Sequence, residues 1–112
     1  MLKPVTISPS DMAAAAADAA ALMKALSNEH RLLILCYLIA EGEMSVGELV
    51  SKIGLSQSAL SQHLAKLRDE ELVTFRREAQ TLFYRVHDDR AASVLVVLQR
   101  LFCPSPDKRE GE

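Results

Sequence analysis

The chain has 112 residues and a formal net charge of −2, and 49% of its residues are hydrophobic while only 4% are aromatic. This length fits one domain, and the composition favours a helical core over a β-sandwich. No apolar run is long enough to span a bilayer and the N-terminus lacks the apolar segment of a secretory signal, so we expect a cytoplasmic protein with no membrane partner. In that compartment Cys36 and Cys103 are not expected to form a permanent structural disulfide.

Helix-capping residues recur along the first part of the chain. Ser10 or Asp11 can begin a first helix, Asn28 can cap a second, and Ser45 with Glu48 matches a capping box for a third. The second helix is apolar nearly all round, so we expect it to be buried at the centre of the domain. The four predicted helices cover residues 11–26, 29–40, 46–52 and 57–70.

The sequence period changes after the fourth helix. Residues 72–77 and 81–86 favour two β-strands joined by residues 78–80. Asp88 or Asp89 then begins a last helix, which Pro104 ends.

The predicted fold class is therefore mainly α with a β-hairpin wing, a winged helix-turn-helix in the order α-α-α-α-β-β-α. We expect a flexible arm at residues 1–10, a DNA-binding and dimerisation domain at 11–103, and a disordered tail at 104–112. The first and last helices carry apolar residues with no other obvious partner, which predicts a homodimer.

Residues 45–69 predict a helix-turn-helix, with the turn at Gly54. In its second helix Leu60, Leu64 and Leu67 form an inward stripe, and the opposite face carries short hydrogen-bonding side chains. Such a helix lies in the DNA major groove, where Gln can pair with adenine and Ser can contact a base or a phosphate. The DNA-binding candidates on this helix are Ser56, Gln57, Ser58, Ser61, Gln62, His63 and Arg68.

The predicted hairpin supplies a second group of DNA-binding candidates, Arg76, Arg77 and Gln80, near its tip. Glu78 at the same tip opposes phosphate binding. His63 fits a phosphate contact and the covering of the helix flank equally well. The alternative for the whole region is a solvated polar face in a winged-helix interaction module that does not bind DNA.

Three stretches of the sequence together resemble the arsenic-repressor (ArsR) family of winged-helix regulators. They are residues 25–35, ALSNEHRLLIL, residues 55–64, LSQSALSQHL, and residues 78–84, EAQTLFY, and the resemblance extends over about residues 18–103. It implies a homodimer, built on the first and last helices, that binds palindromic double-stranded operator DNA and usually represses transcription. No catalytic constellation is visible, so we expect neither enzymatic activity nor a cofactor.

The sequence departs from the metal sensors of that family. Where thiolate sensors carry Cys-Val-Cys, this chain has Ser45, Val46 and Gly47, and His87 and Asp89 lie only at the start of the last helix. Zinc requires about four ligands, so no metal site is predicted. A metal- or arsenite-responsive regulator, or a constitutive one, remains the alternative.

Cys36 and Cys103 are the remaining candidates for a sensing site. By default, Cys36 in an apolar helix is a small buried hydrophobic residue and Cys103 an idle thiol near a helix end. The pair resembles the branch of the family that senses reactive sulfur, which implies that a persulfide or polysulfide links the two thiols and releases the operator. A direct disulfide needs Cα atoms within roughly 7 Å, whereas a longer sulfur chain tolerates a wider gap.

Overall fold

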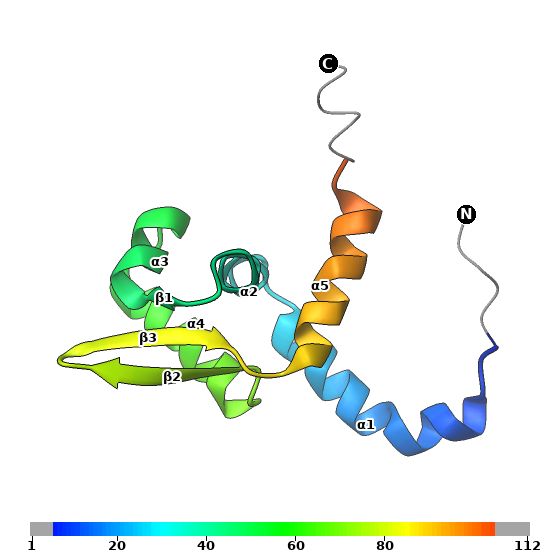
Figure 1. Cartoon of the computed structure of the whole chain (residues 1–112). Helices are drawn as coiled ribbons and strands as arrows, with labels where there is room; N and C mark the ends of the chain where they lie inside the picture. Colours follow the sequence, from blue (N-terminus) through cyan, green and yellow to red (C-terminus); the bar gives the residue numbers. More distant parts are fainter. Residues whose placement is uncertain (1–5, 105–112) are drawn as a thin grey trace.

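The computed structural model of the protein describes residues 6–104, which form five helices and a three-stranded sheet (Figure 1). The predicted fold class is confirmed, and the structure adds one short strand. The elements are α1 (Pro9–Leu26), α2 (Glu29–Glu41), β1 (Met44–Ser45), α3 (Val46–Ile53), α4 (Gln57–Asp69), β2 (Val73–Glu78), β3 (Thr81–Val86) and α5 (Asp89–Phe102). Half of the expected N-terminal arm, residues 1–5, and all of the expected C-terminal tail except Pro104 lie outside the described residues, while Pro9 and Ser10 of the expected arm belong to α1.

Local hydrogen bonds explain where the helices begin. The backbone amide of Asp11 donates to Ser8 Oγ at 3.3 Å, so α1 begins at Pro9, slightly earlier than predicted. Proline is tolerated in a first helical turn because its missing N–H would have no partner there. The predicted caps at Asn28 and Ser45 are confirmed, and Ser45 and Glu48 exchange both hydrogen bonds of a capping box.

The sheet has the order β1-β3-β2, with both pairs antiparallel. β2 and β3 form the predicted hairpin wing, in register from Val73 opposite Val86 to Glu78 opposite Thr81. β1 was not predicted, since two residues carry no recognisable alternation. Because Met44 pairs with Tyr84, this short strand attaches the wing to the segment between α2 and α3.

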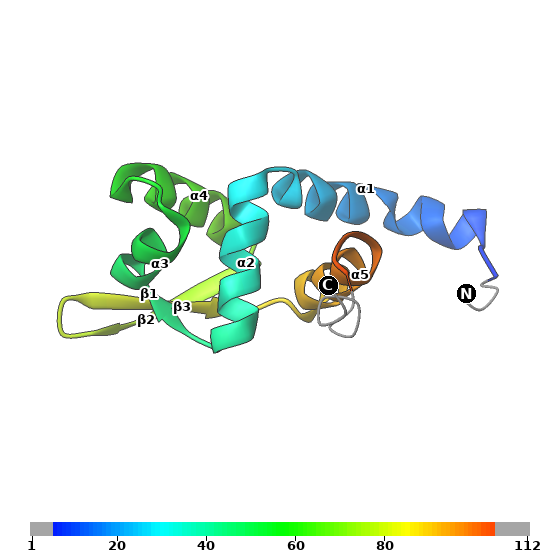
Figure 2. The ribbon, with the colours of Figure 1, turned by 90° about the horizontal axis from the view of Figure 1, so that it is seen from above.

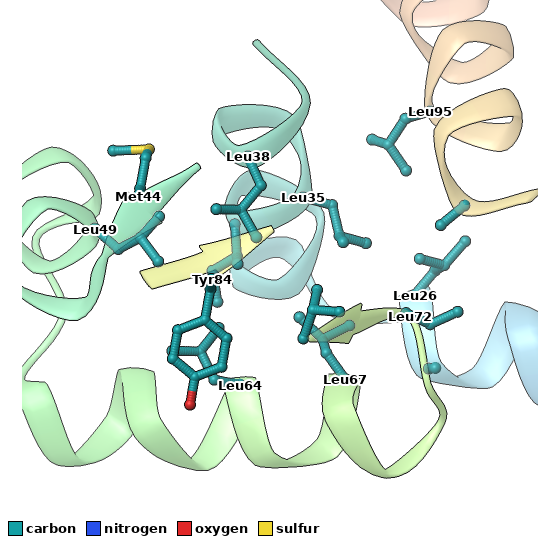
Figure 3. Packing of buried hydrophobic residues seen from close by; sticks show 14 of the residues in the cluster. Leu26, Leu35, Leu38, Met44, Leu49, Leu64, Leu67, Leu72, Tyr84 and Leu95 are labelled. Carbon is teal, nitrogen blue, oxygen red and sulfur yellow. The ribbon is translucent and has the colours of Figure 1, made fainter. Parts of the chain in front are cut away.

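The core lies between α2, α4 and the sheet (Figure 3). The inward stripe predicted for α4 is confirmed, because all three of its leucines are almost fully buried. The central position predicted for α2 is confirmed by its contacts with all four other helices and the sheet, but the prediction of a wholly buried helix is wrong. Ile34, Leu35 and Leu38 face the core, while Leu33 and Ile39 are exposed. Only one face of α2 packs against the core, and the other borders α5 and solvent.

The molecule is extended, with α1 and α5 projecting away from the core on the side opposite the wing (Figures 1 and 2). Its dimensions are 49 × 44 × 21 Å and its radius of gyration is 16.2 Å, against about 13 Å for a compact domain of this length. In α1 only Ala25 and Leu26, at its C-terminal end, are buried. Within the described residues, no helix is long and apolar enough to cross a membrane.

Candidate DNA interface and cysteine pair

The helix-turn-helix is held by two residues at its turn. Gly54 ends α3 with a φ of +87°, in the left-handed region, and its N–H donates to the Val50 carbonyl at 2.9 Å. Ser56 then caps α4, because its Oγ accepts from the Ala59 amide at 3.1 Å. The chain therefore turns within a few residues, and α4 packs against α3.

The polar face of α4 points away from the core. Six of the seven predicted DNA-binding residues on this helix are exposed there, and we call them the reading face: Ser56, Gln57, Ser58, Ser61, Gln62 and Arg68. The Arg68 guanidinium stacks over the Phe75 ring at 5.0 Å, which steadies the arginine against the wing while its charge stays accessible. These residues offer exposed amide, hydroxyl and guanidinium groups along α4.

A hollow of about 460 Å³ joins α4 to the wing, and we call it the α4–wing groove. It brings together Gln57 and Ser61 of α4 with Gln80 of the wing tip, three candidates that are far apart in the sequence. Their amides and hydroxyl can both donate and accept hydrogen bonds, as base edges and phosphates require. The rest of the lining is Ser45, Val46, Gly47, Thr81, Leu82 and Tyr84.

Arg76 and Arg77, both predicted to contact DNA, differ in their surroundings. Arg76 donates to both carboxylate oxygens of Glu43, at 3.0 and 2.9 Å, and to Glu78 at 2.6 Å, and it stacks over the Phe83 ring. These hydrogen bonds raise the pKa of Arg76, and the bond from Arg76 lowers the pKa of Glu43. Arg77 is exposed and has no ion-pair partner among residues 6–104.

Sequence reasoning missed Glu43. It lies between α2 and β1, and antiparallel pairing of the short strand β1 with β3 brings it beside the wing. No local pattern could have identified it, because its partner Arg76 is 33 positions away. The consequence is that the charge of Arg76 is matched within the protein.

His63 is half-buried on the flank of α4. Its Nδ1 lies 3.4 Å from Arg31 Nη1 and its ring centroid lies 5.8 Å from that of His30. Burial, followed by the charges of Arg31, His30 and Lys66, lowers the pKa of His63. Of the two roles predicted for this residue, the geometry favours covering the helix flank.

Cys36 and Cys103 are free thiols, and both are exposed. The expectation that Cys36 is a buried hydrophobic residue is wrong, because it lies on the face of α2 that borders α5. Partial burial within this contact raises the pKa of the Cys36 thiol, and the nearby charge of Cys103 raises it further. Cys103, 67 positions away in the sequence, follows the end of α5, where its N–H donates to the carbonyl of Gln99, a residue that faces α2 beside Cys36.

Cys36 opens into a hollow of about 430 Å³ between α2 and α5, which we call the α2–α5 groove. The other lining residues are Ile39, Ala40, Leu95, Val96, Gln99 and Arg100. The residues that the structure describes include no group of three or more His, Cys, Asp or Glu side chains that could hold a metal ion. Cys36 is a free thiol that small molecules can reach through this groove.

Comparisons with known proteins agree with this geometry. Residues 28–74 match the family model described as bacterial regulatory protein, arsR family. The chain is 48% identical to the transcriptional activator HlyU of Vibrio cholerae, over 91% of this chain and 94% of that protein. It is 44% identical to the biofilm growth-associated repressor of Agrobacterium fabrum, over 79% of this chain and 74% of that protein.

The fold also matches a solved structure from this group. The crystal structure of the transcriptional repressor BigR from Xylella fastidiosa superposes with a TM-score of 0.83 at 40% identity, covering 88% of this chain and 100% of that one. These relatives are named as regulators of transcription, and none of the three is named as an enzyme. The chain therefore belongs to the ArsR family of bacterial regulatory proteins and is a DNA-binding transcriptional regulator with a winged helix-turn-helix.

Proposed function

We propose that this regulator binds palindromic operator DNA as a reduced homodimer and releases it when persulfides or polysulfides link Cys36 to Cys103. The observation that carries the proposal is the placement of two free, exposed thiols: Cys36 lines the α2–α5 groove together with Gln99, and the N–H of Cys103, just after α5, donates to the Gln99 carbonyl. A persulfide link needs two accessible thiols on neighbouring elements, and the exposure of both thiols and the contact between α2 and α5 support this pair.

The proposed chemistry needs only a persulfide RSSH as oxidant. The thiolate of one cysteine attacks the outer sulfur, so that the protein gains a persulfide and RSH leaves. The thiolate of the second cysteine then attacks the inner sulfur of that group, expels HS⁻ and closes a disulfide. If both cysteines first gain a sulfur atom, the terminal sulfur of one attacks the inner sulfur of the other and a trisulfide forms. In each case the two thiols lose two hydrogens, and the expelled sulfur takes up the electron pair.

The link would act on DNA binding through two helices. α2 packs against α3, α4 and the sheet, so it belongs to the DNA-reading half of the molecule, while α5 projects away from that half. Tying α2 to α5 would change the angle between the two reading helices of a dimer. Half-sites lie about 34 to 36 Å apart along the duplex, so a small change in that angle prevents both helices from docking together.

The proposed homodimer uses the surfaces of α1 and α5. Met12 and Met23 of α1 are 54% and 57% exposed, and Leu101 and Phe102 of α5 are 64% and 79% exposed. Helices in proteins depend on tertiary packing for most of their stability, and α1 is buried only at its C-terminal end. The rest of α1 therefore needs a packing partner from outside this chain. A second copy of the chain would cover these apolar side chains.

The proposed DNA contacts are the reading face in the major groove and the wing tip beside it. Gln57, Ser61 and Gln80 would meet the DNA at the α4–wing groove. Arg77 would bind a phosphate, because its charge is unmatched within the described chain. We assign the direction of regulation as repression, as in the biofilm growth-associated repressor, although HlyU is named an activator.

Two cysteine variants test this proposal. Cys36→Ser and Cys103→Ser should bind operator DNA with the affinity of the reduced wild type, because neither thiol lies on the reading face or the wing. Neither variant should release DNA after treatment with a persulfide, whereas the wild type should release it. Fluorescence anisotropy of labelled operator measures all three proteins. Release by either variant as complete as that of the wild type would refute the linked-thiol mechanism.

A further inference from the structure

The α2–α5 groove combines a thiol, an apolar wall and a single cation. Ile39, Ala40, Leu95 and Val96 supply aliphatic surface beside Cys36, and Arg100 is the one charged residue of the lining. No aspartate or glutamate is among the lining residues. Among residues 6–104, Arg100 has no ion-pair partner. The groove therefore offers an unmatched positive charge near the thiol.

We infer that this groove binds the carboxylate of a small organic persulfide through Arg100 and directs its outer sulfur to Cys36. The inference rests on the proposed function and adds the class of sulfur donor. A volume of about 430 Å³ lies in the range of small-molecule sites and accommodates a donor the size of an amino acid. Arginine recognises carboxylates through paired N–H donors, and the aliphatic wall can cover the carbon chain that joins the carboxylate to the sulfur.

The expected selectivity follows from charge. A carboxylate donor gains attraction to Arg100, whereas its neutral ester gains only the apolar contact. Since an exposed ion pair contributes modestly, the preference should be about three- to fivefold and should shrink at high ionic strength. A donor without a carboxylate would still react at Cys36, but more slowly.

Alkylation of Cys36 tests the groove without persulfide chemistry. Iodoacetate and iodoacetamide have nearly the same size and differ in charge, and a Cys103→Ser background leaves Cys36 as the only thiol. The ratio of the iodoacetate rate to the iodoacetamide rate should fall about three- to fivefold in Arg100→Gln, because one exposed ion pair is lost, and stay near the parent value in Arg100→Lys. Lys52→Gln, which loses the same charge on exposed α3 surface, should leave the ratio unchanged.

A second measurement uses sulfur donors on the wild-type dithiol protein. Acetylcysteine persulfide should modify it faster than the methyl ester of that persulfide does, and Arg100→Gln should remove the difference. An alkylation ratio that is the same in Arg100→Gln and in its parent would overturn the inference.

The two proposals fail in different ways. If persulfides leave operator binding unchanged while the alkylation ratio depends on Arg100, the regulatory function is refuted and the carboxylate preference of the groove stands. If persulfides release the operator but Arg100 has no effect on the ratio, the function stands and the groove makes no use of Arg100.

Discussion

Arg76 and Arg77 lie next to each other on β2, yet only one of them has a charge available for DNA. Glu43 and Glu78 bind the Arg76 guanidinium, and the ring of Phe83 lies beneath it. Arg77 has no ion pair within the described chain, so it can approach a phosphate at no cost in broken contacts.

Replacing each arginine by glutamine separates a positioning role from a DNA contact. Arg77→Gln should lower the slope of log Kd against log salt concentration by about two, one released counterion for each subunit of a dimer. Arg76→Gln removes the same charge but should change the slope by less than half as much. Anisotropy titrations over a range of salt concentrations measure both slopes, and a larger change for Arg76→Gln would contradict this assignment.

The pKa of Cys36 gives a second test at this scale. Burial and the charge of Cys103 both raise it, so the reactive thiolate of Cys36 is the minor form near neutral pH and increases as the pH rises. Cys103→Ser removes the second cause. Cys103 repels the Cys36 thiolate only when Cys103 is itself ionised, so the rate at which Cys36 reacts with iodoacetamide should rise in Cys103→Ser at alkaline pH, and the midpoint of its pH profile should move down. A midpoint that does not move would mean that the two thiols do not interact.

The candidate residues could be chosen from the sequence, but their partners could not. Ser, Gln and Arg at helical spacing indicate a face that can bind DNA, and these side chains are exposed in the structure. Arg76 is hydrogen-bonded to Glu43, and His63 to Arg31, and in both pairs the two residues are more than thirty positions apart in the sequence. Contacts of this kind arise from packing and leave no periodic signal.

At the scale of single elements, α3 shows how glycine acts at its two ends. Gly54 ends the helix at a φ of +87°, where a side chain is strained. Gly47 lies within the first turn, and a Cβ atom added there would lie 4.0 Å from its nearest neighbour, Ser45 Oγ. The helix-turn-helix therefore depends on one of these glycines and tolerates substitution of the other.

Alanine at each position should change stability with opposite sign. Gly54→Ala should lower the free energy of unfolding by about 1–2 kcal/mol, because it forces an L-residue into the left-handed region. Gly47→Ala should raise it by up to about 1 kcal/mol, because alanine favours the helical backbone. Urea denaturation followed by circular dichroism measures both, and a stabilising Gly54→Ala would show that the turn differs from this structure.

Elements with local signals were the ones that could be predicted. The side chains of Asn28, Ser45 and Ser56 each accept a hydrogen bond from a backbone amide within three residues, so the start of each helix can be predicted from neighbouring residues. β1 was missed because its pairing with β3 is set by tertiary structure. The burial of α2 was overestimated for a related reason, since apolar composition does not indicate which side of a helix faces a neighbour.

At the scale of the whole molecule, the helix-turn-helix and the wing lie at one end and α1 and α5 extend toward the other (Figure 2), and both of these helices expose apolar side chains. This division fits a dimer in which two reading helices are held at a fixed separation. If α1 and α5 join the subunits, a change in the position of α5 can alter the positions of both α4 helices of the dimer.

A charge placed on the α5 surface should separate the subunits. Val97 is 49% exposed in the single chain, and Val97→Glu should weaken dimerisation by at least about 100-fold, because the carboxylate would be buried without a partner. Ser51→Glu, on exposed α3 surface, adds the same charge and should leave the dimer intact. Sedimentation equilibrium measures both proteins. An unchanged association constant for Val97→Glu would exclude this part of α5 from the interface.

The most direct test of the sensing mechanism combines intact-protein mass spectrometry with operator anisotropy on the same sample after treatment with an organic persulfide. We predict that the protein loses two hydrogens through a link between Cys36 and Cys103, with or without added sulfur atoms, and releases DNA in proportion to the linked fraction. Full operator binding by a fully linked protein, or release by a protein whose two thiols remain free, would contradict the account.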